Sequence, residues 1–321
     1  MLVHHGLRRF ARTRVRGLAA LLKVAGVPAA EVTSGKLGFV VAPRINAAGR
    51  IGESADALRL LLTDDEAEAR RLAEQLDNTN RDRQAEDKRT LAEALQMLER
   101  EYDPGSDFGV VLAGEGWHPG VIGIVASRVV ERIHRPVVLI ALDGERGRGS
   151  ARSIPGFDLY EALQACSAHM LRIGGHKQAA GMDVTRDSVA ALRESFNAEA
   201  GARLDSEDLL PRLCTDVVLD LEQVDLQLVH WMSYLGPHGM GNPGPLFVAS
   251  AAAVQRAKVV GTNHLKATLS QGAGRINAIG FGLADRHPPE AVMAVPQDVV
   301  FRLERNEWKG TARVQARLIA L

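Results

Sequence analysis

The sequence predicts an α/β protein with a long helix, an α/β domain and a small closed β-barrel at its C-terminal end. From Asp64 to about Tyr102 no glycine or proline occurs, and apolar residues recur at helical spacing. Between residues 108 and 171, short β-branched runs bracket a helical pattern, which is typical of α/β domains. Beyond residue 235, about five strand-like runs are separated by glycine and proline turns, which favours a barrel of the OB type.

The same periodicities predict the individual elements. Two short helical patterns lie within residues 2–26 and stop at Gly26. The middle of the long helix, DNTNRDRQAEDKR, is wholly polar, so we expect it to be exposed, as in a helix that bridges two domains. The α/β domain should contain, in order, a strand at 108–113, a helix at 120–133, a strand at 136–142, a helix at 158–171, a strand at 182–185 and a helix at 188–200.

Charge is informative only by its placement, because 39 basic and 39 acidic residues cancel. Residues 1–50 hold nine Lys or Arg against the single acid Glu31, whereas residues 51–105 hold fifteen acids against eight bases. We therefore expect a basic surface that can face an anion, followed by a solvated acidic helix.

The compartment follows from cysteine content and hydropathy. Cys166 and Cys214 have no CxxC or His partner, so neither a disulfide framework nor a zinc site is predicted. No apolar run approaches the roughly 20 residues that span a bilayer, and the N-terminus lacks the pattern of a signal peptide. We expect a cytoplasmic protein that makes no contact with a membrane.

The segment RGSARSIP offers a phosphate cradle between an expected strand and a helix that opens at Asp158. Arg152 can bind a phosphate bidentately, and Ser150 and Ser153 can donate hydrogen bonds where small neighbours permit close approach. The alternative is a basic turn that is simply exposed to water.

The segment GGHKQAAGM is the more unusual one. Gly174 and Gly175 can adopt positive φ and expose backbone N–H groups that line an anion-binding nest. His176 beside them can donate a hydrogen bond to a phosphate or position an attacking water. The alternative is a structural histidine.

Two further segments give weaker signals. PRINAAGR offers Arg44, Asn46 and Arg50 on a stretch broken by small residues, and WHPGVIG places Gly120 at the start of a helix whose amides could receive an anion. For Trp117 and His118 the alternative is a loop packed onto the sheet. In the barrel, Lys258, Lys266 and Trp308 stand out among the basic strands as candidate contacts to a single strand of nucleic acid.

A metal centre is not predicted. Hydrolysis of a phosphodiester would need a cluster of Asp and His ligands for one or two divalent metals, and the sequence shows none. His4 and His5 have no neighbouring Asp, and Asp64 and Asp65 lie where a helix begins and carboxylates serve as caps.

Taken together, these motifs resemble the RecJ-type single-stranded-DNA-specific exonucleases of the DHH phosphoesterase superfamily. The resemblance covers nearly the whole chain. The segments that carry it occur in the family's order: PRINAAGRIG, LLTDDEAEARRLAEQLDNTNRDRQ, WHPGVIGIVASRVVERIHRPVVLIAL, GSARSIPGFDLYEAL, IGGHKQAAGM, AIGFG and LERNEWKG.

The resemblance implies four parts. Residues 1–63 would be the C-terminal remnant of a DHH catalytic domain, 64–103 the connecting helix, 104–210 the DHH-associated domain with its GGH motif, and 211–321 an OB-type domain that binds nucleic acid. The implied activity is metal-dependent degradation of single-stranded DNA from 5′ to 3′ in DNA repair and recombination, with Mn²⁺ or Mg²⁺ as cofactor.

The resemblance also implies roles for particular residues. Ser150 and Arg152 would form the pocket for the 5′ phosphate, and His176 would be the GGH histidine that faces the metal site. The strand contacts near the cleft would be Asn46, Arg50 and Arg59.

The family's metal ligands, including the DHH motif, belong to sequence that would precede Met1, so we expect this chain to bind DNA but to be inactive alone. Expected partners are single-stranded DNA, single-strand-binding protein and a repair helicase, and the chain is expected to be a monomer. Two alternatives remain open. One is a phosphodiesterase for oligonucleotides or cyclic dinucleotides, which the basic barrel argues against, and the other is an inactive DNA-binding scaffold.

Overall fold

In a computed structural model, which describes residues 2–10, 12–308 and 310–321, the predicted long helix is α6 (Glu66–Glu101). It begins at the N-cap Asp65, whose carboxylate accepts hydrogen bonds from the N–H groups of Ala67 at 2.7 Å and Glu68 at 3.2 Å. These bonds satisfy amides that have no partner within the helix. The interpretation of this acidic pair as a helix start is therefore confirmed.

The expectation that the polar middle of α6 is exposed holds for one face only, where for example Asn78, Arg81 and Lys88 are exposed. On the other face three of its polar side chains, Asp77, Asn80 and Asp87, are at most 3% exposed, as is Thr90 directly after it. Arg44 donates to the Asp77 carboxylate at 2.8 Å, and Arg128 lies 3.1 Å from the Asp87 carboxylate. Buried carboxylates are stable only when paired. The partners come from distant segments, which a reading of the helix alone cannot reveal.

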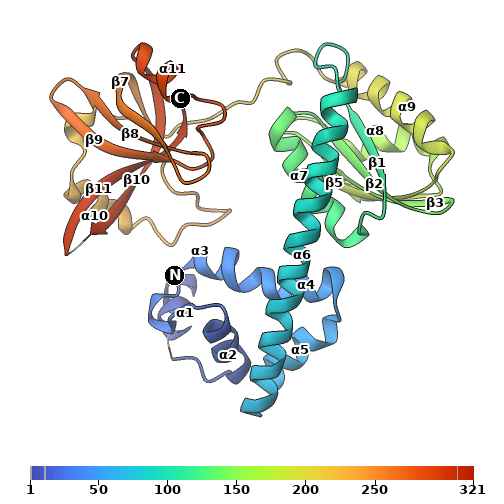
Figure 1. Ribbon diagram of the computed structural model, residues 1–321, viewed down its shortest axis with the longest axis horizontal. Helices are drawn as coiled ribbons and strands as arrows, with labels where there is room; N and C mark the ends of the chain where they lie inside the picture. Colours follow the sequence, from blue (N-terminus) through green and yellow to red (C-terminus); the bar gives the residue numbers. More distant parts are fainter. Residues whose placement is uncertain (1, 11, 309) are drawn as a thin grey trace. The chain divides into compact units, whose positions relative to one another are not determined.

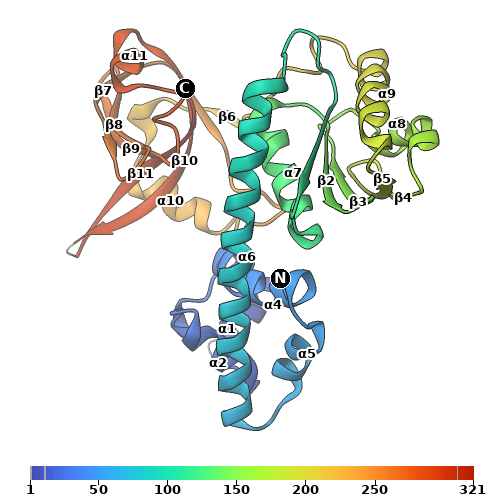
Figure 2. The ribbon, with the colours of Figure 1, turned by 45° about the vertical axis from the view of Figure 1, so that its right-hand side comes forward.

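The chain forms two compact units (Figures 1 and 2). The first comprises residues 36–212 and a preceding helical segment, and the second comprises residues 213–321 with two short N-terminal segments. The helical elements before α6 are α1 (Leu2–Phe10), α2 (Arg16–Val24), η1 (Ala29–Glu31), α3 (Ser34–Lys36), η2 (Leu37–Val41), α4 (Ala42–Ile51) and α5 (Ser54–Leu62). The two predicted helical patterns within residues 2–26 are α1 and α2.

PRINAAGR is a continuous helix, α4, and not a broken segment. Its small residues Ala47 and Ala48 are buried, and α4 packs against α6. Small side chains permit this close approach of two helices.

The α/β domain is a five-stranded sheet of order β1-β2-β3-β5-β4, in which only β1 and β2 are parallel. Its elements are β1 (Val110–Glu115), α7 (Pro119–Ile133), β2 (Val137–Asp143), β3 (Arg146–Arg152), α8 (Leu159–Ala165), η3 (Ser167–His169), β4 (Arg172–His176), β5 (Ala179–Thr185) and α9 (Ser188–Arg203). Along β2, Val137 and Leu139 pack on the side of α7, while Val138 and Ile140 pack with α8 and α9. Helices therefore cover both faces of β2, and α7 lies between α6 and the sheet (Figure 1).

Three expectations in this domain need correction. RGSARS, expected between a strand and a helix, belongs to strand β3 as far as Arg152. GGHKQAAG, expected as an anion-binding nest, is the β4–β5 hairpin, and the helix expected at 158–171 ends at Ala165. The strand β3 was not predicted, because its buried positions are glycine and alanine, which give no alternating apolar pattern. A Cβ at Gly149 would lie 2.6 Å from the Met182 Cγ, so close packing requires glycine there.

The second unit is a closed five-stranded barrel, as predicted. The strands follow the order β7-β8-β9-β11-β10, and pairing of β10 with β7 closes the sheet. β9 and β11 are parallel. Its elements are β6 (Val217–Val218), η4 (Leu221–Gln223), α10 (Leu226–Ser233), β7 (Phe247–Val260), β8 (His264–Gln271), β9 (Gly274–Gly280), α11 (Pro289–Ala294), β10 (Gln297–Trp308) and β11 (Thr311–Ala320).

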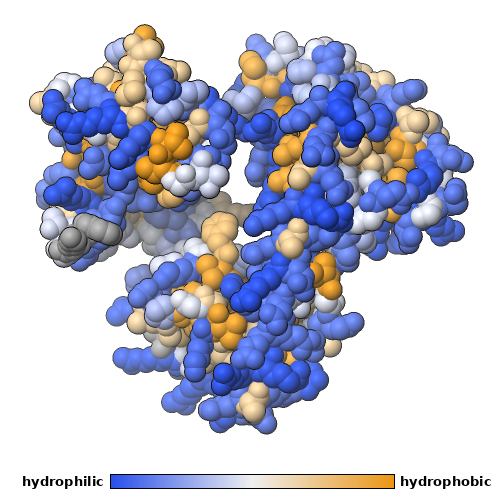
Figure 3. All heavy atoms as spheres, in the orientation of Figure 1, coloured by the Kyte–Doolittle hydropathy of each residue, from blue (hydrophilic) through white to orange (hydrophobic). Residues whose placement is uncertain are grey.

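The surface in the view of Figure 3 is mainly hydrophilic, and hydrophobic side chains appear on it as separate patches. Among the described residues, no helix is long and apolar enough to cross a membrane.

The buried carboxylate of Asp77 on α6 allows the contribution of its two arginine partners to stability to be tested. Arg44→Ala should lower the free energy of unfolding by about 2 kcal/mol, because Asp77 is buried and loses a charged hydrogen bond. Arg81 also contacts Asp77, but its side chain is 70% exposed, so Arg81→Ala should cost less than about 1 kcal/mol. Urea denaturation of the two variants measures the difference, and equal losses would contradict this assignment.

Candidate nucleic-acid interface

A cavity of about 600 Å³ lies where α4, α7 and β3 meet. Four of the residues predicted as nucleic-acid contacts line it: Asn46 and Arg50 from α4, and Ser150 and Arg152 from β3. We call this cavity the arginine pocket. The fold therefore brings together two motifs that are far apart in the sequence.

Two glycines on α7 make room for the arginine pocket. A Cβ at Gly120 would lie 2.1 Å from the Arg50 carbonyl oxygen, and a Cβ at Gly123 would lie 2.7 Å from the Arg152 Nη2. The Arg50 Nη1 donates to the Gly120 carbonyl oxygen at 3.3 Å. Gly123 was not predicted as a site residue, since glycine offers no side-chain chemistry. Its spacing of three from Gly120, on one face of a helix, is the signal that could have identified it.

The electrostatics of the arginine pocket favour an anion. The Arg152 Nη1 donates to the Ser150 Oγ at 3.0 Å and to the Ala151 carbonyl oxygen at 2.8 Å. Among the described side chains, no carboxylate lies within ion-pair distance of Arg50 or Arg152. Burial, and then the neighbouring charge of Arg50, lowers the pKa of Arg152. An oxyanion would relieve both effects by charge-assisted hydrogen bonds.

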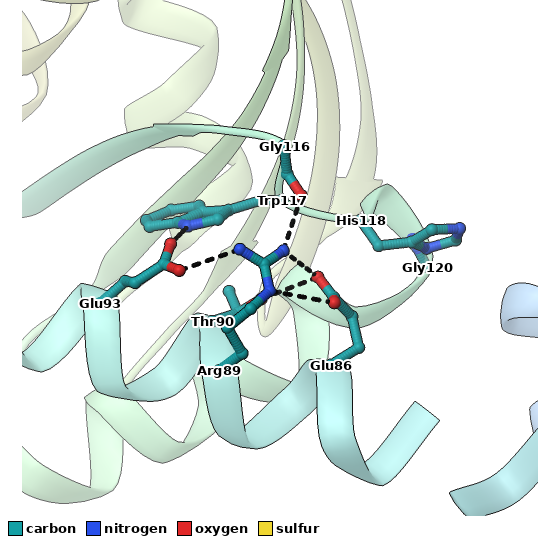
Figure 4. Close-up of polar contacts among 8 residues, drawn as sticks. All are labelled: Glu86, Arg89, Thr90, Glu93, Gly116, Trp117, His118 and Gly120. Atoms are coloured by element: carbon teal, nitrogen blue, oxygen red, sulfur yellow. Dashed lines mark hydrogen bonds and ion pairs between the residues drawn. The ribbon is translucent and has the colours of Figure 1, made fainter. Parts of the chain in front are cut away.

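The loop that leads into α7 is clamped to α6 (Figure 4). Arg89 donates to Glu86 at 2.6 Å, to Glu93 at 2.9 Å and to the Gly116 carbonyl oxygen at 2.7 Å. The Trp117 indole, which is buried, donates to Glu93 at 2.7 Å. The hydrogen bond between Arg89 and Glu86 lowers the pKa of the Glu86 carboxyl group and raises the pKa of the Arg89 guanidinium group. This network fixes the start of the helix that forms one wall of the arginine pocket.

His118 caps α7. Its Nδ1 accepts a hydrogen bond from the Gly120 N–H at 3.0 Å. The N–H groups of Val121 and Ile122 donate to the His118 carbonyl oxygen at 2.9 and 3.2 Å. The first amides of α7 are therefore already satisfied, and the expectation that they receive an anion is corrected: Gly120 instead lets α4 and α7 approach closely.

His176 lies at the end of β4 and is exposed. In the sheet register Arg152 is opposite Ala179, which is opposite His176. Paired residues of antiparallel strands point to the same face, so Arg152 and His176 share a face on strands about 10 Å apart. The Ser153 N–H also donates to the Gln178 carbonyl oxygen at 3.1 Å, which joins the two predicted motifs directly.

Gly174 and Gly175 do not form the expected nest, because both continue the regular pairing of β4 with β5. A Cβ at Gly175 would lie 2.5 Å from the Ala180 Cα, so glycine there permits close pairing of the strands. A Cβ at Gly174 would meet nothing within 4 Å, and this exposed position leaves the sheet face flat.

Three other predicted contacts lie outside the arginine pocket and are engaged within the protein. The Ser153 hydroxyl donates to the Phe157 carbonyl oxygen at 2.8 Å. Arg44 is bound to the buried Asp77, and Arg59 forms an ion pair with Glu68.

In the barrel, four exposed cations lie in one row across the strands. Lys258 of β7 is opposite Lys266 of β8, Lys266 is opposite Ile279 of β9, Ile279 is opposite Arg317 of β11, and Arg317 is opposite Arg302 of β10. We call Lys258, Lys266, Arg302 and Arg317 the basic row. Arg317 also forms an ion pair with Glu304 at 3.6 Å, which offsets part of this charge. Like charges directly opposite each other destabilise a sheet, so the pairs Lys258–Lys266 and Arg302–Arg317 favour a bound polyanion.

Arg317 also lies over an exposed aromatic ring, with its guanidinium carbon 5.4 Å from the Phe281 ring centroid. Sequence reasoning missed Phe281. Of the predicted barrel contacts, the Trp308 side chain lies outside the described residues. Among the side chains that are described, no group of three or more His, Cys, Asp or Glu could hold a metal ion.

Comparison with known families places this fold in a class. Residues 106–202 match the DHHA1 domain, and residues 215–320 match the RecJ OB domain. The chain is 35% identical to the single-stranded-DNA-specific exonuclease RecJ of Bacillus subtilis, over 97% of this chain and 40% of that relative. It is 33% identical to the Escherichia coli enzyme of the same name, over 98% of this chain and 56% of that relative.

Solved structures agree. The crystal structure of RecJ in complex with Mn²⁺ from Thermus thermophilus matches with a TM-score of 0.82 and 32% identity, over 99% of this chain and 46% of that one. Its Mg²⁺ complex matches with a TM-score of 0.79 and 32% identity, over 98% of this chain and 47% of that one. The chain is therefore similar to RecJ proteins along nearly its whole length and carries a DHHA1 domain followed by a RecJ OB domain. It spans about half the length of the relatives that it matches.

The two α7 glycines give a paired test. Gly120→Ala should lower the free energy of unfolding by about 1–3 kcal/mol, because its Cβ meets backbone. Gly123→Ala should change it by less than about 1 kcal/mol, because its Cβ meets only the ends of the Arg152 and Ser150 side chains and alanine favours the helix. Its affinity for a phosphorylated oligonucleotide should nevertheless fall.

Urea denaturation and fluorescence anisotropy measure the two properties. Full retention of affinity in Gly123→Ala would show that Arg152 does not bind the phosphate.

Proposed function

We propose that this chain binds the 5′-phosphorylated end of single-stranded DNA in the arginine pocket, as part of a metal-dependent 5′ to 3′ exonuclease. The observation that carries the proposal is the pair Arg50 and Arg152, which share a pocket without a carboxylate partner among the described residues. A terminal phosphate carries more charge than a backbone phosphodiester and presents three oxygens for bidentate contacts.

The choice of substrate is supported by the relatives, which are named as single-stranded-DNA-specific exonucleases. The barrel supports it independently, because the basic row offers cations for phosphate contacts on four of the five strands. We assign Lys258 and Lys266 to the nucleic-acid backbone on this ground. Asn46 and Ser150 are assigned as hydrogen-bond donors to the terminal phosphate, since both line the pocket.

His176 is proposed to act on the strand next to the terminal phosphate. It shares a sheet face with Arg152 and is exposed, and the side-chain-free Gly174 leaves space on that face. Arg44, Arg59 and Ser153 are assigned to packing rather than to DNA, because each is already bound inside the protein.

The related Thermus structures contain Mn²⁺ or Mg²⁺. The described residues of this chain do not fit such an ion, because they form no cluster of three potential ligands. We therefore derive no hydrolytic step from them and propose that the 321-residue chain alone binds DNA without cleaving it. We further propose that the functional division of the chain lies near residues 63, 103 and 210.

The preference for a 5′ phosphate tests this function. Arg152→Ala should reduce the affinity ratio between 5′-phosphorylated and 5′-hydroxyl single strands by about tenfold or more, because a charged hydrogen bond is lost. Arg148→Ala is the matched control: it lies four residues before Arg152 on β3, is exposed, and does not line the arginine pocket. Fluorescence anisotropy on the complete chain gives both ratios.

A wild-type chain without any 5′-phosphate preference would contradict the proposal, as would equal losses in the two variants. In the same samples, Mn²⁺ should leave the oligonucleotide intact. Release of nucleotides would contradict the proposal that the chain alone binds without cleaving.

A further inference from the structure

A second cavity, of about 740 Å³, lies beside the arginine pocket in the same unit. Pro119 lines both cavities. Asp183, which lines the second one, lies two residues after Gly181, the sheet partner of Ser150 in the arginine pocket. Side chains alternate along a strand, so the two cavities are neighbours on one face of the sheet, separated by roughly 7 Å. We call the second one the adjoining cavity.

The walls of the adjoining cavity are fixed by the fold. One wall is the loop that contains Trp117 and His118, which the Arg89 network clamps to α6 (Figure 4). The floor includes Ala141 of β2, and Leu171, which is 59% exposed, adds apolar surface at its edge. Preformed cavities of roughly 300–1,000 Å³ that combine apolar surface with a few polar groups are typical of sites for small molecules.

The adjoining cavity differs from the arginine pocket in charge. Its charged lining consists of three carboxylates and two arginines, namely Glu86, Asp143, Asp183, Arg146 and Arg148. Glu86 is bound by Arg89, and the other four residues form two pairs of opposite charge across neighbouring strands. Such pairs compensate each other. The cavity therefore offers hydrogen-bonding groups without an excess of positive charge, which suits an uncharged polar group better than a further phosphate.

The position of the adjoining cavity defines what can enter it. The proposed function places the nucleic-acid strand beside His176, which lies in the same row of the sheet as Arg152. The adjoining cavity lies toward the opposite end of β3, beyond Ser150. A group that extends into it from the arginine pocket is therefore attached to the 5′ phosphate itself, on the side away from the strand.

We propose that the adjoining cavity binds a nucleoside that is joined to the 5′ end of the strand through a phosphoanhydride. This linkage keeps about two negative charges for Arg50 and Arg152, as many as a 5′ phosphate carries. The base and the sugar are uncharged, and their amino and hydroxyl groups can donate hydrogen bonds to carboxylates such as Asp183. The inference rests on the proposed function, because it places the 5′ phosphate in the arginine pocket.

The chemistry of such an end also places the protein in a reaction sequence. Transfer of a nucleotidyl group to a 5′ phosphate, which activates an end for strand joining, is the class of reaction that supplies it. A strand whose joining stops after this step keeps the nucleotidyl group, and the adjoining cavity would allow this protein to bind that end.

Strands that differ only in the 5′ end test the proposal. The complete chain is titrated by fluorescence anisotropy with strands that end in a 5′ hydroxyl, a 5′ phosphate, a 5′ triphosphate or a 5′-adenylyl group in phosphoanhydride linkage. Divalent metal is omitted so that the ends stay intact. The adenylylated strand should bind at least about fivefold more tightly than the phosphorylated strand, because the nucleoside adds contacts. The triphosphate strand should gain less, because the adjoining cavity has no excess of positive charge.

Variants locate the effect. Ala141→Leu fills part of the cavity, and Leu171→Ala removes apolar surface from a side chain too exposed to matter for folding. Each should reduce the advantage of the adenylylated strand about threefold or more, and affinity for the phosphorylated strand should stay unchanged. Leu210→Ala is the matched control, because this side chain is 63% exposed and lines neither cavity.

Equal affinity for the adenylylated and phosphorylated strands would overturn the inference. So would an advantage that Ala141→Leu and Leu171→Ala both retain, or a triphosphate strand that binds as tightly as the adenylylated one. Loss of the preference for a 5′ phosphate over a 5′ hydroxyl would instead contradict the proposed function. An adenylylated strand that still binds more tightly in that case, in a manner that depends on Leu171, would support the nucleoside site alone.

Discussion

The approach of α4 to α7 is the constraint on which the arginine pocket depends. The Arg50 carbonyl lies so close to Gly120 that no side chain fits between the two helices. Because of this contact, Arg50 reaches the same cavity as Arg152, which comes from a strand of the sheet. Without it, two guanidinium groups would lie on separate surfaces, where each would be solvated and neither would favour an anion.

α6 packs against both α4 and α7 and so holds these two helices in fixed positions. Its buried carboxylates bind arginines from α4 and α7, and the Arg89 network fixes the loop before α7. A helix with an apolar middle could pack equally well, but it would not fix the positions of charged partners on both sides. Removal of one buried partner leaves an uncompensated charge, so the network is expected to resist alternative packings.

Periodicity predicts much of this fold. The helices α6 and α7 and the barrel strands are long enough for their apolar spacing to be evident in the sequence. β3 is hidden because Gly147, Gly149 and Ala151 occupy its buried face, where side chains of the neighbouring strands leave no space. The burial of Asp77 could not be predicted, because its partner Arg44 is on another helix.

The candidate site, too, could be predicted from the sequence only in part. Asn46, Arg50, Ser150 and Arg152 could be named from residue type, since arginines and hydroxyls among small residues suit phosphate. Their convergence in one pocket requires the tertiary structure. Ser153 has the right chemistry, but its hydroxyl is used by a turn, and only the structure shows this.

The central claim is that Arg50 and Arg152 together hold the 5′ phosphate. A crystal structure of the chain with a short 5′-thiophosphorylated single strand tests it most directly, because the anomalous signal of sulfur locates the terminal group. The account predicts a sulfur peak in the arginine pocket, with the thiophosphate in hydrogen-bond contact with both guanidinium groups. A terminal thiophosphate bound elsewhere, with the pocket unaltered, would contradict it.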